Sequence, residues 1–445
     1  MWIGIDDTDS RSGGCTTYVA FKLVQSLQKQ GYFIVGYPRL VRLNPNVPWK
    51  TRGNGAVAIQ VSKTKKSDLL IGQKKNIDIL SSKKEKTDTN FTKQDKKKLI
   101  AIVEDIVESF SELDGKNTNP GIVLIDHPLD ESWYWKAVRE ILTIEEVVDH
   151  LRSKKAFFKK YNLGRGVIGS SAAIAWVPTK KKTFELISYR EKKKWGTKRT
   201  IDQQSVRAMD ENCNSLFDSY DYKNDHSCID PHSPCPVLYG IRGINPKDLP
   251  KCQDMIQSEA KMGWMLFESN QGTDDHLQQT KIKKISAYQS VIISGKVNTK
   301  PFTVKGGHVL FSIKDREDNH IDCAAYEPTK QFRNRIRNLC RGDEIVVHGG
   351  VRKQPLTVNI EKILIKKLVK SFEKIKNPVC PCCGKHMKSK GKNQGYRCKK
   401  CNTSKDKAIM KEKKRLITLG FYEVPVVARR HLSRPLKLME TDEKK

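Results

Sequence analysis

The sequence predicts a multidomain α/β protein that continues into a β-barrel and a small metal-binding ribbon. Strand and helix patterns alternate over residues 1–275, and five strand patterns with one helix pattern follow from residue 290. Closely spaced cysteines then occupy residues 380–401. The chain of 445 residues is long enough for about three or four domains, and its hydrophobic content of 37% lets each bury a core. No apolar run approaches the roughly 20 residues that cross a bilayer, which predicts a cytoplasmic protein.

Charge and cysteine usage narrow the function. Lys and Arg number 83 against 50 Asp and Glu, so the net charge is +33 and a polyanionic partner is expected. RNA or DNA fits better than an anionic membrane, because the sequence has no long amphipathic basic helix. Five of the twelve cysteines lie within residues 380–401, a pattern typical of a metal site in a reducing compartment and not of a disulfide framework.

The first residues predict a nucleotide and metal site. A short buried strand over residues 2–5 is followed by three carboxylates: Asp6, Asp7 and Asp9. Such a cluster suits Mg²⁺, which takes one or two carboxylates and completes its shell with water and phosphate. Two glycines and two threonines then lead into a helix pattern: Gly13, Gly14, Thr16 and Thr17. A glycine turn at a helix N-terminus presents N–H groups to the phosphates of a nucleotide. The alternative is an acidic surface turn before an ordinary capped helix.

Two further segments suit phosphate. The turn-rich loop over residues 39–55 carries basic side chains and glycines, among them Arg39, Arg42, Lys50, Arg52, Gly53 and Gly55. The alternative there is a solvated loop anchored by Trp49. A second glycine turn precedes an alanine-rich helix and consists of Gly164, Arg165 and Gly166. It predicts another phosphate-binding turn, although its small residues also allow tight packing of a helix on a sheet.

The sequence between these motifs predicts the following secondary-structure elements. A lysine-rich flexible insertion is expected at 81–97, a strand at 121–127, and helices at 132–142 and 144–160. Strands at 183–189 and 236–243 with helices at 201–210 and 246–259 predict a ferredoxin-like layer. The loop between them contains four candidate zinc ligands: His226, Cys228, His232 and Cys235. Their spacing matches no standard finger, so a proline-rich surface loop is the favoured interpretation.

The C-terminal half predicts an OB-fold and a zinc ribbon. Strand patterns at 290–297, 308–314, 321–326, 344–349 and 357–365, with a helix at 330–339 after the third, have the OB order. OB-folds commonly bind oligonucleotides, though the fold alone is only an analogy. Two cysteine pairs then have the spacing of a structural four-thiolate zinc site: Cys380, Cys383, Cys398 and Cys401. Cys382 is a spare thiol.

Several strings resemble one family. The residues Ile3-Gly4-Ile5-Asp6-Asp7-Thr8-Asp9-Ser10 with Gly14-Cys15-Thr16-Thr17, and later Asn270-Gln271-Gly272-Thr273-Asp274, are similar to the archaeal enzymes that make 2-agmatinylcytidine in the minor isoleucine tRNA. The resemblance spans nearly the whole chain. The domains expected are an ATP-binding kinase-like domain (1–182), a ferredoxin-like domain (183–275), an OB-fold (280–370), a zinc ribbon (376–405) and a basic tail that adds to the RNA surface (406–445).

The resemblance implies a specific reaction. ATP phosphorylates the 2-oxo group of the wobble cytidine in the CAU anticodon, and the amine of agmatine displaces the phosphate. ATP and Mg²⁺ are placed at Asp6, Asp7 and Asp9, with Thr16 as a phosphorylatable residue. Agmatine is a dication and needs acids, for which the candidates are Asp126, Asp274 and Asp275. No obligate protein partner is expected. The rival is a non-catalytic protein that binds single-stranded nucleic acid, which leaves the N-terminal carboxylates without a role.

Overall fold

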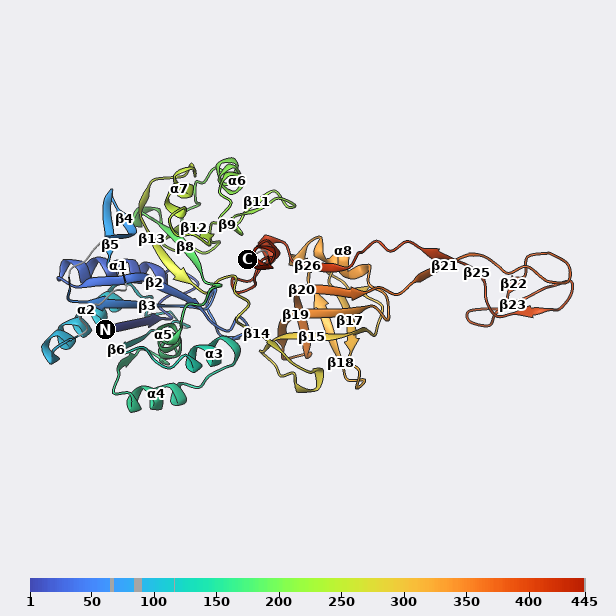
Figure 1. The fold of residues 1–445 in the computed structure, drawn as a ribbon, viewed down its shortest axis with the longest axis horizontal. Coiled ribbons are helices and arrows are strands. Elements are labelled where there is room, and N and C mark those ends of the chain that lie inside the picture. Colours follow the sequence, from blue (N-terminus) through green and yellow to red (C-terminus); the bar gives the residue numbers. More distant parts are fainter. Residues whose placement is uncertain (65–67, 84–89, 116, 444–445) are drawn as a thin grey trace.

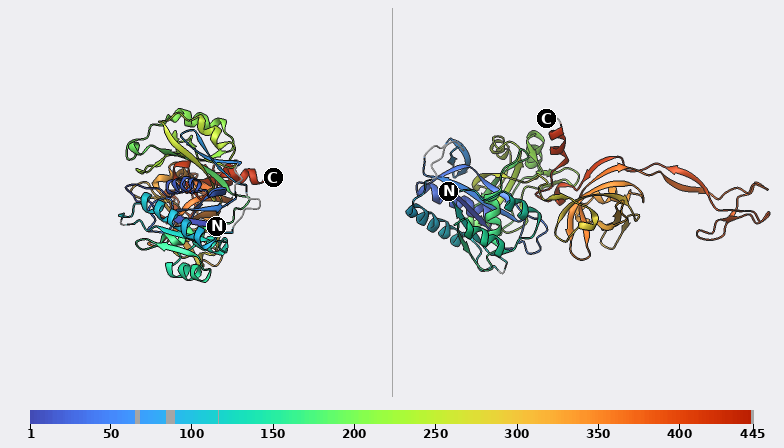
Figure 2. Two further views of the ribbon diagram at one scale, coloured as in Figure 1. Left: turned by 90° about the vertical axis from the view of Figure 1, so that its left-hand side faces the viewer. Right: turned by 60° about the horizontal axis from the view of Figure 1, so that its bottom comes forward.

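The molecule consists of an α/β body, a β-barrel and a long two-stranded arm that ends in a small ribbon (Figure 1). The computed structural model describes residues 1–64, 68–83, 90–115 and 117–443. The right-hand view of Figure 2 shows that the arm projects away from the body and the barrel. Among the described helices, none combines the length and the apolar character needed to span a membrane.

One mixed sheet runs through the whole body. Its order is β7-β6-β1-β3-β2-β13-β8-β12-β9, and the hairpin of β4 and β5 pairs with β13. The strands are β1 (Trp2–Asp6), β2 (Phe33–Arg42), β3 (Gly55–Ser62), β4 (Leu69–Lys74), β5 (Ile77–Ser81), β6 (Gly121–Ile125), β7 (Phe157–Lys160), β8 (Thr183–Arg190), β9 (Leu216–Phe217), β12 (Val237–Gly243) and β13 (Lys261–Ser269). The parallel pairing of β2 with β13 joins the two halves, so the layer predicted over 183–275 continues the N-terminal sheet.

Helices cover the faces of this sheet. The helices α1 (Thr16–Lys29) and α2 (Lys93–Phe110) pack on one face, and α3 (Ser132–Arg139), α4 (Ile144–Ser153) and α5 (Gly166–Ala175) pack on the other. Ile3 and Ile5 of β1 point into the first core and Trp2 into the second, as the alternation of side chains along a strand requires. In the second half, α6 (Gln203–Asn212) and α7 (Leu249–Asp254) bury their own core.

Some predicted boundaries differ from the structure. The helix expected over 144–160 ends at Ser153, and β7 follows it at the edge of the sheet. The helix expected over 246–259 is only α7. Of the expected insertion at 81–97, residues 84–89 lie outside the described residues, whereas 93–97 form the first turns of α2 behind a capping box of Thr92 and Asp95.

The barrel has the element order predicted for an OB-fold. Its strands are β15 (Ser290–Val297), β17 (Val309–Lys314), β18 (His320–Ala325), β19 (Glu344–Arg352) and β20 (Thr357–Lys367). Pairing of β15 with β17 and of β18 with β20 closes these five strands into a barrel. The helix α8 (Phe332–Arg337) lies between the third and fourth strands, as expected. Short strands extend the sheet: β14 (Leu277–Gln279), β16 (Phe302–Thr303) and β26 (Gly420–Glu423).

The arm carries the ribbon. It is formed by β21 (Ser371–Lys376) and β25 (Ile409–Lys413), and the ribbon contains β22 (Lys388–Ser389), β23 (Tyr396–Arg397) and β24 (Ser404–Lys405). The remaining elements are β10 (Tyr220–Asp221), β11 (His226–Ser227), α9 (Leu436–Glu443) and the 3-10 helices η1 (Lys192–Lys194), η2 (Ile282–Lys284), η3 (Glu327–Thr329) and η4 (Val426–Ala428).

The C-terminal segment folds back instead of forming a free basic tail. After β26 joins the barrel, residues 424–434 pass between barrel and body, where the C-terminus lies in Figure 1. The fully buried ammonium of Lys362 on β20 lies 2.6 Å from the carboxylate of Asp274 and donates to the carbonyl of Arg434. Arg434 is itself buried and donates to the carbonyl of Gly272. The charged side chains of Lys362, Asp274 and Arg434 therefore connect the barrel to the body.

One disulfide links the ends of two helices. Cys213 follows α6 and is bonded to Cys252 of α7. The composition of the chain predicted thiols and a metal site instead of disulfides. The bond closes a loop of the body, and such closure restricts the unfolded chain.

Candidate functional site

A cavity of about 500 Å³ opens between the two halves of the body and the returning C-terminal segment. Its walls come from residues after β1, from the loop between β2 and β3, from the mouth of α5, and from β8 and β12. Eleven of the residues predicted to bind metal or phosphate line it: Asp6, Asp7, Asp9, Thr16, Thr17, Arg42, Lys50, Arg52, Gly53, Gly55 and Arg165. Segments far apart in the sequence therefore meet at one site.

The three carboxylates share this site because the chain turns at Asp7. Asp7 has a φ of 56°, a left-handed conformation that Asp tolerates better than most residues. Its carboxylate accepts from the backbone N–H of Asn119 at 3.2 Å. Asp9 is held by Arg52, whose Nε lies 3.2 Å from the Asp9 carboxylate. In a regular strand Asp6 would point away from Asp7, so this turn makes the cluster possible.

The cluster strongly disfavours its own negative charge. Burial and the neighbouring Asp7 raise the pKa of Asp6 well above its ordinary value. Burial and Asp9 raise the pKa of Asp7 to about 6. Burial also raises the pKa of Asp9, although the charge of Arg52 opposes it. Buried like charges of this kind are stabilised by a bound cation.

Thr16 and Thr17 begin α1 beside the carboxylates. Both are buried, and Thr8 donates from its hydroxyl to the hydroxyl oxygen of Thr16 at 3.1 Å. The hydroxyl of Thr17 lies 3.1 Å from the sulfur of Cys15. Both side chains line the cavity and are available to a phosphate group there.

The glycines of the two predicted turns are tightly packed against neighbouring residues. Gly13 and Gly14 do not line the cavity, and a Cβ on either would lie 2.8 Å from the side chain of Glu112. A Cβ on Gly166 would lie 2.3 Å from the backbone nitrogen of Gly121. The turn of Gly164, Arg165 and Gly166 was predicted either to bind phosphate or to allow tight packing of a helix on the sheet. Gly166 fits the packing alternative. Gly164 also lies outside the cavity lining.

Helix α5 approaches the carboxylates most closely at a residue that the sequence did not single out. A Cβ on Gly169 would lie 1.9 Å from Oδ2 of Asp6. Only glycine leaves room for the carboxylate there, so α5 fixes the position of Asp6. At the mouth of the same helix, the guanidinium of Arg165 stacks 4.6 Å from the centre of the Trp49 ring.

The loop over residues 39–55 supplies cations, but some are already engaged. Besides Asp9, Arg52 donates to the carbonyls of Ser10, Gly13 and Gly14, so it clamps the acidic loop. Arg39 is buried and donates to the carbonyl of Trp176. Lys50 lines the cavity and donates to the carbonyl of Pro45. Burial and Arg430 lower the pKa of Lys50 to about 8.

The glycines of this loop admit other side chains. A Cβ on Gly53 would lie 2.8 Å from Nη1 of Arg42, and a Cβ on Gly55 would lie 3.0 Å from the same atom. Arg42 also approaches Glu185 on β8 at 3.4 Å, and Arg242 on β12 approaches the same carboxylate at 3.3 Å. Gly53 and Gly55 therefore let Arg42 reach across the cavity wall.

The predicted agmatine acids lie elsewhere. Asp126 pairs with Lys96 at 2.6 Å, and Asp274 pairs with Lys362. Asp275 accepts from the hydroxyl of Tyr134 at 2.5 Å. None of the three lines the cavity that contains Asp6. The acids that do line it beyond the N-terminal cluster were not predicted: Glu140, Glu185, Asp218 and Asp230.

Two of these acids have no partner for their side chains. Glu185 is paired with Arg42 and Arg242, and Asp218 with Arg429. Within the described part of the chain, the side chains of Glu140 and Asp230 have no hydrogen bond or ion pair. A cationic ligand therefore finds free negative charge at these two positions.

The loop with the four candidate zinc ligands forms a wall of the cavity. His226, Cys228, His232 and Cys235 all line it. Arg199 holds the loop by donating to the carbonyls of Pro231, Ser233, Cys235 and Val237. In the described residues, the one group of three or more His, Cys, Asp or Glu side chains that lie close enough together to hold a metal is in the ribbon. The structure thus provides no zinc site in this loop, and the loop is more than a surface feature.

The C-terminal segment contributes residues that the sequence analysis missed. Val426, Val427, Arg429 and His431 line the cavity. Arg429 pairs with Asp218 of the body, and Arg430 donates to Oδ1 of Asn46 at 2.6 Å. The run of Arg429, Arg430 and His431 was the only local signal, and composition alone did not distinguish it from a basic tail.

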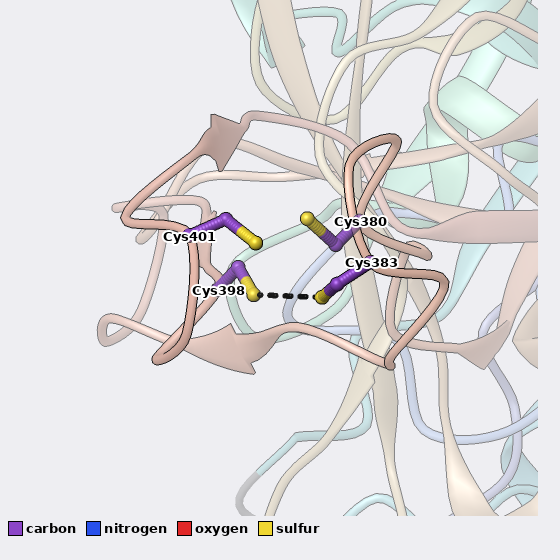
Figure 3. A group of neighbouring side chains, drawn as sticks. All are labelled: Cys380, Cys383, Cys398 and Cys401. Carbon is purple, nitrogen blue, oxygen red and sulfur yellow. Dashed lines mark hydrogen bonds between the residues drawn. The ribbon is translucent and has the colours of Figure 1, made fainter.

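The ribbon cysteines form a metal site. Cys380, Cys383, Cys398 and Cys401 point toward one another, and their sulfur atoms all lie within 4.8 Å (Figure 3). The Sγ atoms of Cys383 and Cys398 are 3.5 Å apart. Cys382 is exposed and is not part of this group. Four converging thiolates in a ribbon are a structural zinc site, as predicted.

Comparison with known proteins identifies the family. Family models match at residues 2–163 (TiaS TCKD domain), 164–276 (TiaS FLD domain) and 377–417 (TiaS C-terminal zinc ribbon domain). The isoleucine tRNA 2-agmatinylcytidine synthetase TiaS of Methanocaldococcus jannaschii is 43% identical, with 99% of each chain covered. The enzyme of the same name from Archaeoglobus fulgidus is 38% identical and covers 99% of this chain and 98% of its own.

Solved structures agree. The complex of TiaS with its isoleucine tRNA and ATP matches with a TM-score of 0.83 and 37% identity, over 98% of this chain and 96% of that chain. The complex of TiaS with the same tRNA, AMPCPP and agmatine matches with a TM-score of 0.80 and 34% identity, over the same shares. Full-length similarity at this level leaves one conclusion: the chain belongs to the TiaS family of isoleucine tRNA 2-agmatinylcytidine synthetases.

Proposed function

We propose that this protein is an ATP-dependent ligase that joins agmatine to C2 of the wobble cytidine in the CAU anticodon of the minor isoleucine tRNA. The observation that carries the proposal is the cavity that combines Asp6, Asp7 and Asp9 with surrounding cations. Relatives named for this activity cover the full chain, and similar structures contain the isoleucine tRNA, ATP or its analogue, and agmatine. A protein that only binds single-stranded nucleic acid has no use for such a cavity.

The carboxylates fit Mg²⁺. Burial and mutual repulsion raise the pKa values of Asp6 and Asp7, and a divalent ion removes this penalty. Mg²⁺ held by one or two of these carboxylates, with water and phosphate oxygens as its other ligands, would neutralise phosphate charge on ATP. Lys50 and Arg165 face the same cavity and would stabilise the transferring phosphoryl group. Thr16 lies beside the three carboxylates and offers a hydroxyl group that can be phosphorylated.

The reaction has two steps. The 2-oxo oxygen of the cytidine attacks a phosphorus atom of ATP, and the resulting phosphate ester is a good leaving group. The primary amine of agmatine then attacks C2, and phosphate leaves with the electrons of the C–O bond. Asp230 and Glu140, which are free of partners in the described structure, supply negative charge for the guanidinium end of agmatine. They replace Asp126, Asp274 and Asp275 as the candidates for this role.

The other domains present the RNA. We assign a kinase-like role to residues 1–182 and a ferredoxin-like layer to residues 183–275. Both segments contribute residues to the wall of the cavity. The barrel and the lysine-rich ribbon would grip the tRNA, whose backbone is attracted by the net charge of +33. A tRNA substrate places the enzyme in the cytoplasm.

One assay tests the proposal. The purified protein is incubated with labelled agmatine, ATP, Mg²⁺ and individual tRNA transcripts, and label in the RNA is counted. Label is expected only in the isoleucine tRNA with the CAU anticodon and only when ATP is present. Changing Asp7 to Asn should abolish incorporation while tRNA binding is retained. ATP-independent labelling, or full activity of the Asp7→Asn variant, would refute the assignment.

A further inference from the structure

We propose that His431, from the C-terminal segment, accepts the proton that the amine of agmatine loses when it attacks the activated cytidine. This inference rests on the proposed function and assigns a residue to its second step. It comes from the position of the imidazole in the cavity and from the absence, among the residues that the structure describes, of a hydrogen-bond partner for its ring.

The backbone around His431 is held firmly at the cavity. Gly272 donates from its N–H to the carbonyl of His431 at 2.8 Å. On one side of His431, Arg430 contacts Asn46 at 2.6 Å and Glu361 at 3.3 Å. One residue earlier, Arg429 pairs with Asp218. The segment is therefore fixed to both body and barrel, and the ring is placed at a defined position.

The ring itself is unengaged. A Cβ on Gly53 would lie 3.0 Å from Nε2 of His431, so the ring abuts the loop of residues 39–55. Nδ1 is buried without a hydrogen-bond partner, and in the described residues Nε2 has none either. Buried polar atoms are rarely left unpaired, and an exception of this kind in a cavity points to a ligand.

The other groups able to accept a proton in the cavity are less suitable. Glu185 is paired with two arginines and Asp218 with Arg429. The N-terminal carboxylates are assigned to Mg²⁺, and Glu140 and Asp230 are assigned to the guanidinium end of agmatine. The two further cavity histidines, His226 and His232, are exposed on the loop held by Arg199. His431 is thus the histidine that protein encloses on the inner side of the cavity.

The surroundings keep this imidazole neutral before the reaction. Burial lowers the pKa of His431 well below its ordinary value, and the charges of Arg42 on β2, Arg242 on β12 and Lys50 in the following loop lower it further. A neutral imidazole has a free lone pair at physiological pH. Phosphate on the cytidine would offset these three cations. The proton affinity of His431 would then rise when the activated substrate is present.

The proton transfer completes the balance of the second step. Agmatine enters as a dication, so its ammonium group first loses one proton to water. The resulting neutral amine nitrogen forms a bond to C2, and the bond between C2 and the phosphate oxygen breaks. The nitrogen becomes positively charged as it bonds and releases one proton to His431. Phosphate departs with the electron pair, and the step needs no oxidant or reductant.

The test uses the full-length protein with His431 changed to Gln or to Asn. Single-turnover transfer of agmatine should fall about 100-fold or more, the usual range for loss of a general base. ATP-dependent phosphate transfer to the tRNA and tRNA affinity should be unchanged. Hydroxylamine needs far less help from a base because it is weakly basic, so its incorporation should fall much less. The matched control is His127→Gln, an exposed histidine outside the cavity, which should behave as wild type.

Several outcomes would overturn the inference. Wild-type agmatine transfer by both His431 variants is one. An equal loss with agmatine and hydroxylamine is another, since it would show that His431 only shapes the site. Thermal melting of both variants shows whether either is unfolded. Failure of the proposed function itself is distinguishable, because then the wild-type protein and the His127→Gln control would also incorporate no agmatine.

Discussion

Arg52 lies with its Nε 3.2 Å from the carboxylate of Asp9, and its two other nitrogens donate to the carbonyls of Ser10, Gly13 and Gly14, which follow that residue. One guanidinium thus fixes both the charge and the path of the acidic loop. Lysine has the same charge but lacks the planar fork that makes these contacts simultaneously.

We therefore expect Arg52→Lys to lower agmatine incorporation about 100-fold while leaving tRNA affinity intact. The matched control is Arg11→Lys, since Arg11 is exposed in the same loop. Equal activity of the two variants would show that the loop holds its shape without Arg52.

A methyl group at residue 169 should displace Asp6. The ideal Cβ position of Gly169→Ala is 1.9 Å from Oδ2 of Asp6, so the carboxylate or α5 must move. We expect a loss of about 1–3 kcal/mol in the free energy of unfolding and loss of agmatine incorporation. Ser171→Ala in the same helix is the control, because its buried hydroxyl has no partner. Normal activity of Gly169→Ala would mean that Asp6 need not occupy this position.

Bound zinc should be needed for the ribbon to fold and to bind tRNA, but not for ATP binding by the body. The buried core of the ribbon is only Cys380, Met387 and Cys398, too small to fold without metal. Cys398→Ser should lose the bound zinc and weaken tRNA binding, while ATP binding to the body remains. Cys382→Ser, at the exposed spare thiol, should retain both. Zinc content measured by emission spectrometry and tRNA binding by filter retention would show this difference; equal metal content in the two variants would contradict the assignment.

Stability should depend on pH through Glu361. Burial opposes ionisation of Glu361, but its interactions with His276, Arg430 and Lys362 outweigh burial and lower the pKa of Glu361 from 4.5 to about 2. A lowered pKa means that the ionised form stabilises the folded state above pH 4.5 and that this contribution is lost as the pH falls toward 2. The contribution of ionised Glu361 to the free energy of unfolding is on the order of 3 kcal/mol.

Glu361→Gln should therefore melt below wild type at pH 7, and the difference should shrink as the pH falls below 4.5. Thermal unfolding at several pH values measures it. A difference that stays constant with pH would show that the charge of Glu361 is unimportant.

Local patterns predicted much of this molecule. The barrel strands, α1 and the four ribbon thiolates could be located because their periodicity or spacing is contained within a short segment. The acidic cluster was found for the same reason. The turn at Asp7 that brings the three carboxylates together, however, is a property of the backbone.

Long-range contacts could not be predicted. The role of Gly169 depends on the distance between α5 and Asp6. The pairing of Asp274, a predicted agmatine residue, with Lys362 joins positions 88 residues apart in the sequence. Arg429 and His431 looked like part of a basic tail because their partners lie on the body. No single window of sequence contains both sides of such contacts.

The return of residues 426–431 to the cavity has a consequence for biosynthesis. A ribosome that has already released the acidic loop and the sheet must still translate the barrel, arm and ribbon before the last wall is available. A nascent or prematurely terminated chain therefore lacks a complete cavity. ATP is consumed only by molecules whose translation has passed residues 426–431.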